Sequence, residues 1–470
     1  MRILVKTYGL ILLAALAPGC ALTNVTDPDA GTTARDLRPS PTGGSPSAIV
    51  PPVQGPITLA EAIRIALANN PELAATSSEV DAAQAQRDAA AGRRLPSLHA
   101  IAGYNRYLDD QRLLPVRQNG ELAVFSQDIF AGDLVVRMPL YTGGRLISEI
   151  KAADLLRQAA EHRLARSRQE LVFNVSSVFY STLAQGKVIE SLEFSQKVLE
   201  EHLKQVDNLI AGEKAAQVDR LRTQVRLADL QQRLVRERNV LEIQGRVLAN
   251  LLGLPEESHP ISASGQLEAE ASSPPALEAS LSDAFRQRED YVAATAGLEA
   301  QAKAVDAARA GHLPTVSLVG SYGERWTPDA SERPSGTSTS DDVGVVGVIA
   351  DIPLFEGGQI DARVRQEQAR LSAARYRLRE LKLQIRLDVE TALLNLRSAR
   401  ERIQATESAV GLAQESLRIE RQKYDLGRGS ITDVLDAQSA LLDSQTNYFR
   451  AWADYDTGTA QLALAVGGQR

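Results

Sequence analysis

Two stretches of the sequence, residues 144–210 and 358–424, carry apolar residues at alternating steps of four and three. The series runs through residues 171–210 in the first stretch and 385–424 in the second, and neither stretch contains proline. Arg, Glu, Gln and Lys fill the flanking positions. A seven-residue repeat predicts left-handed coiled coils, and each helix would be about 100 Å long at about 1.5 Å per residue. The polar exceptions in the two series are Thr182, Gln185, Gln196, Thr406 and Glu420.

Four shorter stretches predict β-strands, because small polar residues and glycine alternate loosely with aliphatic residues in them. The loops between them, 109–121 and 327–342, are polar and contain proline and glycine, so we expect them in water. Strands of this length and pattern are typical of membrane β-barrels, although four surface strands on a helical protein remain an alternative. The predicted strands span residues 98–108, 124–140, 316–326 and 343–354.

The body of the chain contains an internal sequence repeat. Motifs of the first part recur in the second at offsets of 214 to 222 residues, which predicts a duplication with an approximate internal two-fold axis. We assign 57–252 to the first repeat, 253–280 to a connector and 281–466 to the second repeat. The paired motifs are Thr58–Ala62 with Ser280–Ala284, Leu95–Leu98 with Leu313–Val316, Met138–Gly144 with Ile352–Gly358, and Gly212 and Asp219 with Gly427 and Asp433.

Each repeat contains a junction between its second strand and its long helix. Pro139 and Pro353 lack an N–H group, so we expect each to end the strand ladder. A glycine pair that follows each proline permits a sharp turn into the helix. These pairs are Gly143 with Gly144 and Gly357 with Gly358.

The N-terminus predicts export and lipidation. Residues 1–19 combine a basic start with a short apolar run and small residues, as a secretory signal peptide does. Cys20 follows directly and resembles the lipidated cysteine of bacterial lipoproteins; a plain signal peptide with an incidental cysteine is the alternative. Ala21 comes next, where the resemblance implies an outer-membrane destination. The rest of residues 20–56 is rich in Pro, Gly, Ser and Thr and predicts a flexible tether.

Composition excludes several other classes of protein. The net charge is −7, which argues against a nucleic-acid partner. A single cysteine excludes a disulfide framework and a cysteine-based zinc site. We find no phosphate-binding loop, no nucleophile elbow and no histidine pair at metal-ligand spacing, so we expect neither an enzyme nor a cofactor or metal. The scattered histidines are His99, His162, His202, His259 and His312.

Four strands cannot close a barrel, and an open sheet edge is not tolerated in lipid. Two protomers would supply eight strands, whose interior is filled by side chains. Three protomers would supply twelve strands and leave a lumen. If the strands cross a membrane, the pattern therefore favours a trimer with a shared barrel and a hollow tube of helices.

The repeated layout, the Pro-Leu-aromatic-x-Gly-Gly junctions, the segment 69–73 and the segment Tyr424–Gln438 resemble the TolC-like outer-membrane efflux proteins. The resemblance implies a mainly α-helical homotrimer with a twelve-stranded β-barrel in the outer membrane. It implies a passive exit duct that works with a periplasmic adaptor (membrane fusion protein) and an inner-membrane pump of RND or ABC type. Such a duct serves efflux or type I secretion.

Asp433 and Asp436 lie three residues apart at a predicted helix start, hence on one face. By symmetry they would form acidic rings that favour cations, and the resemblance places them at the periplasmic entrance. Compensation of the helix dipole is the alternative. The resemblance also implies an entrance lock at Asp219 and Tyr424. Gly429 occupies the place of the usual basic partner, and Arg428 lies next to it in the sequence. Simple packing is the alternative for Tyr424.

A second class of function stays open at this point. The chain could be a lipid-anchored periplasmic coiled coil, structural or adaptor-like, that forms no barrel. The strands discriminate between the two hypotheses, because charges placed on a lipid-facing surface would prevent insertion of a barrel and leave an adaptor intact.

Overall fold

The structure is a computed structural model that describes residues 55–213, 216–255, 261–267 and 273–468. The predicted signal peptide (1–19), Cys20 and the predicted tether up to residue 54 lie outside the described residues. Parts of the predicted connector, 256–260 and 268–272, lie outside them as well.

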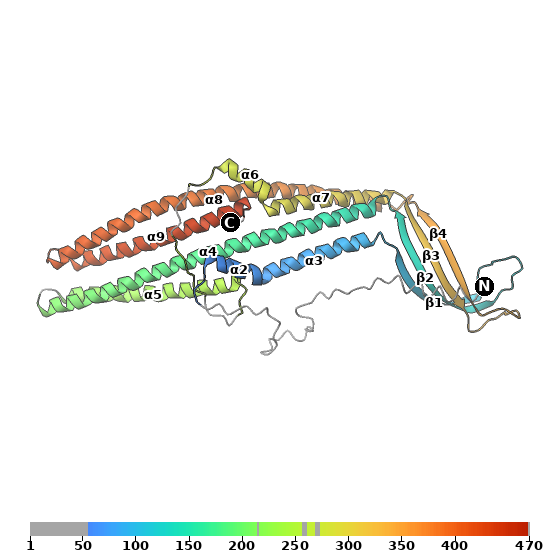
Figure 1. Cartoon of the computed structure of the whole chain (residues 1–470), viewed down its shortest axis with the longest axis horizontal. Coiled ribbons are helices and arrows are strands. Elements are labelled where there is room, and N and C mark those ends of the chain that lie inside the picture. Colours follow the sequence, from blue (N-terminus) through green and yellow to red (C-terminus); the bar gives the residue numbers. More distant parts are fainter. Residues whose placement is uncertain (1–54, 214–215, 256–260, 268–272, 469–470) are drawn as a thin grey trace. The chain divides into compact units, whose positions relative to one another are not determined.

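The described residues form two equivalent series of elements (Figure 1). In each series, two helices lead into two strands, a helix of 67 residues and a closing helix. This confirms the predicted mainly helical fold with a duplicated unit. The first series is α2 (Leu59–Asn69), α3 (Pro71–Gly92), β1 (Ser97–Arg112), β2 (Phe125–Tyr141), α4 (Arg145–Ala211) and α5 (Gln217–Leu251), and the second is α6 (Leu277–Gln287), α7 (Glu289–Arg309), β3 (Thr315–Trp326), β4 (Ser340–Asp351), α8 (Gln359–Asp425) and α9 (Ile431–Val466), with a short 3₁₀ turn η1 (Ala310–His312).

The opening of the first series consists of two helices, although the alanine-rich sequence from 59 to 92 runs through both. The break falls at Asn70, which ends α2 and caps α3 by accepting a hydrogen bond from the N–H of Leu73 at 3.1 Å. Pro71 cannot continue α2, because it lacks an N–H group and disfavours a helical residue before it. The Asn70 amide also donates to the carbonyl of Leu251 at 3.0 Å, which joins the break to the end of α5.

The equivalent break between α6 and α7 has no proline. It falls at Arg288, whose side chain is buried and pairs with Asp290 at 2.6 Å and with Asp388 of α8 at 2.8 Å. A buried guanidinium is stable only with such partners. The pairing therefore fixes the kink against the long helix.

The four strands form one antiparallel sheet in the order β1-β2-β3-β4. β2 and β3 come from different halves, so the sheet is continuous across the duplication. Pro139 does not end β2 as expected: it pairs with Ser317 at a register shift, and the strand continues to Tyr141. Pro353 lies beyond the end of β4, which stops at Asp351.

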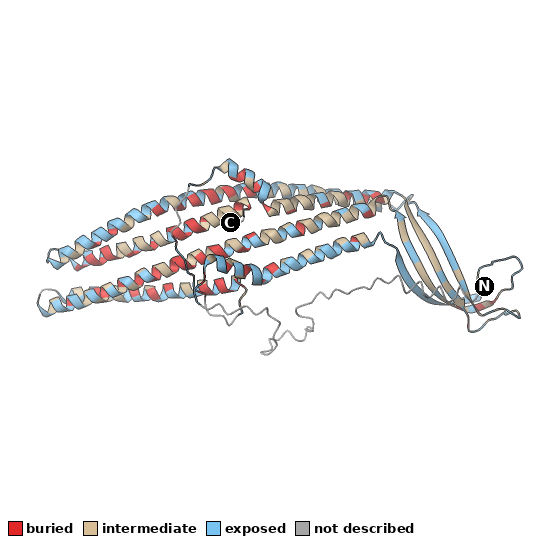
Figure 2. Ribbon diagram, in the orientation of Figure 1, coloured by how far each residue is buried: buried red, intermediate tan, exposed pale blue. Residues whose placement is uncertain are grey.

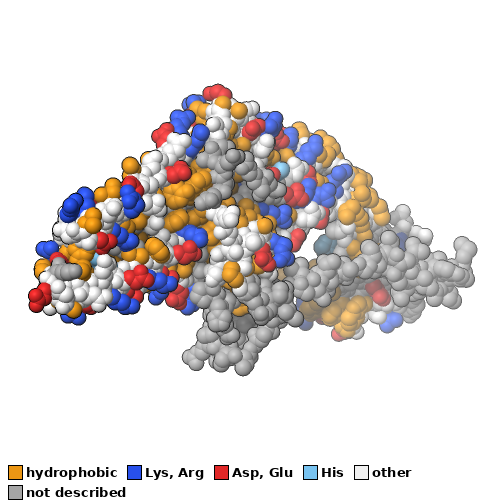
Figure 3. Space-filling view, turned by 60° about the vertical axis from the view of Figure 1, so that its left-hand side comes forward, with side chains coloured by type: hydrophobic (Ala, Val, Ile, Leu, Met, Phe, Trp, Pro, Cys, Tyr) orange, Lys and Arg blue, Asp and Glu red, His pale blue; other side chains and the backbone are white. Residues whose placement is uncertain are grey.

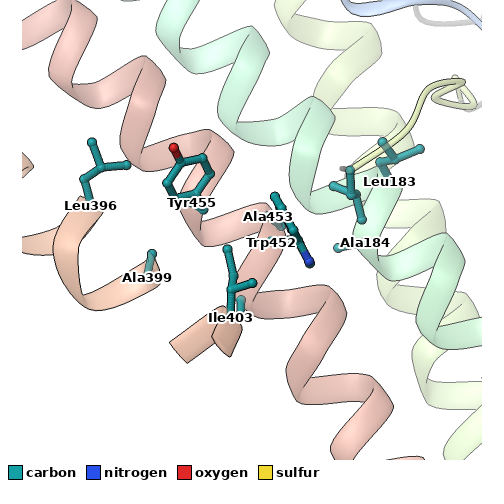
Figure 4. Close-up of a cluster of buried hydrophobic side chains, with 10 residues drawn as sticks. Leu183, Ala184, Leu396, Ala399, Ile403, Trp452, Ala453 and Tyr455 are labelled. Carbon is teal, nitrogen blue, oxygen red and sulfur yellow. The ribbon is translucent and has the colours of Figure 1, made fainter. Parts of the chain in front are cut away.

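The helices pack as two hairpins, α4 with α5 (hairpin 1) and α8 with α9 (hairpin 2), and α4 also packs against α9. Toward the strands, α3 packs on α4, and α7 packs against both α4 and α8 (Figure 1). Buried residues concentrate along the hairpins (Figure 2). The strand residues are exposed or intermediate, except Ser126 and Ile129 of β2, which are buried. Around Trp452 of α9, side chains of α4 and α8 close one core cluster (Figure 4).

The apolar series predicted for α8 is largely the buried face of that helix, as Ile385, Val389, Leu396 and Leu417 illustrate. α4 is different, because it packs against both α5 and α9. Its buried residues therefore include the predicted series and a second stripe beside it, represented by Phe179, Leu183 and Val188. Within the described ranges, no helix combines the length and apolarity needed to cross a membrane.

Candidate functional site

The turn of hairpin 2 holds most of the residues predicted at the entrance. α8 ends at Asp425, and Gly427 adopts a positive φ of 68°, which favours glycine. The N–H of Arg428 then returns to the carbonyl of Lys423 at 2.8 Å. Ser430 caps the start of α9. The turn is thus fixed by backbone geometry within a few residues of the predicted acids.

Asp433 and Asp436 are both exposed on the first turns of α9. Asp433 is the third helical residue and completes a capping box, since its carboxylate accepts a hydrogen bond from the N–H of Ser430 at 3.3 Å. Its charge also lies at the positive end of the helix dipole. The carboxylate of Asp433 therefore stabilises the helix start, and the carboxylates of Asp433 and Asp436 both face solvent in the protomer.

Tyr424 lies between the hairpins and packs against buried residues of α4, α5 and α9. Burial raises its pKa, with further contributions from the negative charges of Asp219 and Asp425. Its hydroxyl is enclosed and has no hydrogen-bond partner among the described residues. Asp219 thus influences Tyr424 through its charge, without a hydrogen bond between them in the described structure.

In the described protomer, no hydrogen bond or ion pair joins the side chain of Arg428 to Asp219 or Tyr424. The Arg428 side chain is exposed, and no ion pair joins it to any described residue. Gly429 occupies a tight place instead: a Cβ there would lie 3.0 Å from the Cβ of Lys423.

Other polar contacts join the two hairpins, and sequence reasoning missed them. Gln205 of α4 donates to Asp425 of α8 at 2.9 Å. Arg222 and Arg233 of α5 reach α9, each across 210 residues of sequence, where they bond to Thr432 and Asp443 at 3.0 and 2.9 Å. That spacing is close to the repeat offset. The duplication could therefore have pointed to these contacts.

The strand–helix junctions show the conformation that the glycine pairs allow. Gly143 and Gly144 have φ of 61° and 85°, and Gly357 and Gly358 have φ of 59° and 79°. Both second glycines are helix N-caps. Gly143 is also in close contact, because a Cβ there would lie 2.6 Å from the Cβ of Leu313.

One face of the sheet is mainly apolar, and the charged residues on it, Arg106, Asp128, Glu324 and Asp342, lie toward the loop ends of the strands. Cross-strand partners share a face, so the register places Tyr104, Phe130 and Trp326 side by side across β1, β2 and β3. Their rings stack in a row, with centroids 4.7 and 4.3 Å apart. The rest of this face, which we call the apolar face, includes Leu98, Leu134, Val136, Leu318, Tyr322, Val346 and Val348.

The opposite face of the sheet carries more polar groups. Asp133 and Arg325 form an ion pair at 2.8 Å there, and Ser317, Ser321 and Asp341 share that side. Aliphatic residues such as Val345 and Ile349 separate them. The sheet therefore has two chemically different faces.

α8 carries a second apolar stripe that no described helix covers. Its residues stand about two positions from the buried series, which is roughly 200° around a helix. Hydrophobic side chains are mixed with charged ones on the surface of the helices (Figure 3). The stripe, which we call the outer stripe, consists of Leu383, Leu387, Leu394, Leu412 and Ile419 of α8 and of Leu426, the residue that caps its end. α5 has a shorter stripe at Val218, Leu221 and Val225.

Among the described residues, no group of three or more His, Cys, Asp or Glu side chains is placed to hold a metal ion. Two histidines form pairs, His162 with Glu289 at 2.5 Å and His312 with Asp361 at 3.4 Å. His202 packs against Tyr424 instead.

Comparison with known proteins identifies the family. The model for outer membrane efflux proteins matches residues 62–254 and 280–468. The outer membrane protein TolC of Vibrio cholerae is 24% identical over 410 residues, which cover 87% of this chain and 90% of that protein. The proteases secretion protein PrtF of Dickeya chrysanthemi is 25% identical over 428 residues, covering 85% of this chain and 88% of that protein.

A solved structure shares the fold. The CmeC outer membrane channel of Campylobacter jejuni superposes with a TM-score of 0.74 at 17% identity, and the match covers 87% of this chain and 85% of that one. The resemblance seen in the sequence is thereby confirmed. The family model matches most of the chain in two segments that coincide with the two structural halves, and the chain belongs to the outer membrane efflux protein family.

Proposed function

We propose that three copies of this chain form an outer-membrane channel, in which twelve strands close a barrel and the helices continue as a tunnel into the periplasm. The observation that carries the proposal is the sheet. β1 pairs only with β2 and β4 only with β3 in the described chain, so both outer edges are unpaired. The apolar face favours a place in lipid, but unpaired backbone groups are not tolerated there, and in water an unpaired sheet edge invites pairing with another chain. Neighbouring copies satisfy both requirements.

The outer stripe supports the same arrangement in the helices. α8 buries one apolar face against α9 and leaves the other exposed. A helix in the wall of a tube has a neighbour on each side, and the next copy would supply the missing one. The stripe on α5 is its natural counterpart, since α5 also packs against only one long helix of its own chain.

The channel acts as a passive exit duct. Its relatives include a protein named for protease secretion and a channel of the efflux family, so a role in efflux or type I secretion is supported by similarity. A periplasmic adaptor and an inner-membrane pump of RND or ABC type would complete the system and supply the energy. We propose that lipid on Cys20 adds a second attachment to the outer membrane.

The periplasmic entrance lies at the turns of the hairpins. Asp433 and Asp436 are exposed there, and three-fold symmetry would repeat them around the pore. Rings of carboxylates raise the local concentration of cations. We propose cation selectivity for this reason, with Asp219, Tyr424 and Arg428 contributing to closure.

Conductance of the purified protein in planar bilayers tests the proposal. Wild type should give a small, cation-selective conductance, and Asp433→Ala/Asp436→Ala should lose much of that selectivity. Asp81→Ala, which removes an exposed aspartate from α3, is the matched control and should keep it. Unchanged selectivity in the double variant would remove the acids from the pore. Trimers that never conduct would contradict the duct itself.

The alternative of a coiled coil without a barrel gains no support from these observations. It would leave the apolar face of the sheet in water, where a contiguous apolar patch favours association.

A further inference from the structure

A cavity of about 150 Å³ lies between the two hairpins, near the ends of α4 and α8. Its polar lining includes His202 and Gln205 from α4 and Arg421, Tyr424 and Asp425 from α8. Water occupies about 30 Å³ per molecule, so the space holds a few waters. The cavity is polar and sits on the contact that joins the hairpins.

Two side chains direct enclosed polar atoms to this contact. The rings of His202 and Tyr424 lie 5.4 Å apart at an angle of 58°. The His202 Nε2 and the Tyr424 hydroxyl are both shielded from solvent, and neither has a hydrogen-bond partner among the described residues. A neutral imidazole nitrogen accepts and a phenol donates, so one bridging water or a small ring movement would satisfy both groups.

Charged groups surround the imidazole on both helices. Arg421 and Asp425 face it from α8, Glu201 lies beside it on α4, and Asp219 of α5 acts on Tyr424. Burial lowers the pKa of His202, and Arg421 lowers it further, against opposing effects of Asp425 and Gln205. The closed contact therefore favours the neutral ring.

We propose that His202 holds hairpin 1 to hairpin 2 through Tyr424 while its ring is neutral, and that its protonation loosens this contact and opens the entrance. His202 is a positioning residue, since it acts on the pore through the hairpins. This inference rests on the proposed function as a duct. It supplies a lock residue on α4 at a site where the side chain of Arg428 forms no ion pair with any described residue.

The pH dependence of conductance distinguishes this role from simple packing. Between pH 7.5 and 5.5 the wild-type channel should gain conductance by at least about threefold. Because burial lowers the pKa of His202, the gain should be concentrated at the acid end of this range. His202→Gln, which keeps hydrogen bonding but does not titrate there, should flatten the profile. His312→Gln is the matched control and should retain it. Equal profiles for wild type and His202→Gln would overturn the inference while leaving the duct intact.

A distance measurement separates this inference from the proposed function. Spin labels on Asn208→Cys and Gln422→Cys, both exposed and near the ends of α4 and α8, report the gap between hairpins in trimers diluted with unlabelled chains. The distance should lengthen on acidification and stay constant when His202→Gln is added. A distance that does not respond to pH, or responds equally in both proteins, overturns the role of His202 whether or not the channel conducts.

Discussion

Asp456 is a buried carboxyl on α9, and burial raises its pKa to about 7. Because the pKa is higher in the folded than in the unfolded chain, its contribution to stability is complete below about pH 4 and is lost as pH rises through 7. Asp456→Asn should therefore stabilise the protein at pH 8, on the order of 2–4 kcal/mol, and change little at pH 4. Thermal unfolding across pH 4–8 measures this. An equal effect of the variant at both ends would contradict the assignment.

The two strand–helix junctions differ at the residue scale although their glycines match. Gly143→Ala combines a disfavoured positive φ with a contact of 2.6 Å to Leu313, whereas Gly357→Ala has open space and only the strained φ. We expect about 1–2 kcal/mol of destabilisation for Gly357→Ala and clearly more for Gly143→Ala. Melting temperatures of the two variants provide the comparison. Similar losses would mean that the close approach at Gly143 has no energetic weight.

For single residues, the sequence predicted where functional residues lie along the chain better than which residues they contact. The glycine pairs, Tyr424 and the exposed acids could be read from local motifs. His202 could not, because its neighbour on α8 depends on how two distant hairpins pack. The same holds for Gln205, whose contact with Asp425 spans 220 residues.

At the scale of the element, α8 allows a direct comparison of two leucines on different faces. Leu417 is buried against α9, and Leu412 is 74% exposed on the outer stripe. Leu417→Ala should lower the stability of the fold by about 2–5 kcal/mol. Leu412→Ala should spare the hairpin and reduce the fraction of trimer. Thermal melting measures stability, and analytical ultracentrifugation in detergent measures the fraction of trimer. We expect each variant to change only one of these two quantities. Equal behaviour of the variants would mean that the outer stripe takes no part in assembly.

The periodic pattern gave the long helices to within a residue at either end, since nothing in residues 145–211 or 359–425 interrupts it. The pattern predicted one buried stripe on α4, whereas the structure has two. A periodic pattern indicates that a face is buried but not how many helices pack against it. The break at Asn70 does not show in the periodic pattern, because the helical pattern continues on both sides of this single capping residue.

At the scale of the whole molecule, the duplication was predictable because the motifs recur at a nearly constant offset. The family followed from their order along the chain, and the comparisons bear it out. The strand that lies at each sheet edge and the face on which each apolar strand residue lies could not be predicted in the same way. Both follow only from the strand order and register of the structure.

In the proposed channel, the apolar face of the sheet lies against lipid. Val346 lies on that face and is 79% exposed, while Val345 is the adjacent residue, 59% exposed, on the opposite face. A charge on the lipid side of a barrel costs about 2–4 kcal/mol near the membrane midplane. The decisive measurement is the fraction of folded trimer inserted in outer membranes for Val346→Arg beside Val345→Arg. We expect Val346→Arg to fail to insert and Val345→Arg to insert. Normal insertion of Val346→Arg would show that this face does not meet lipid.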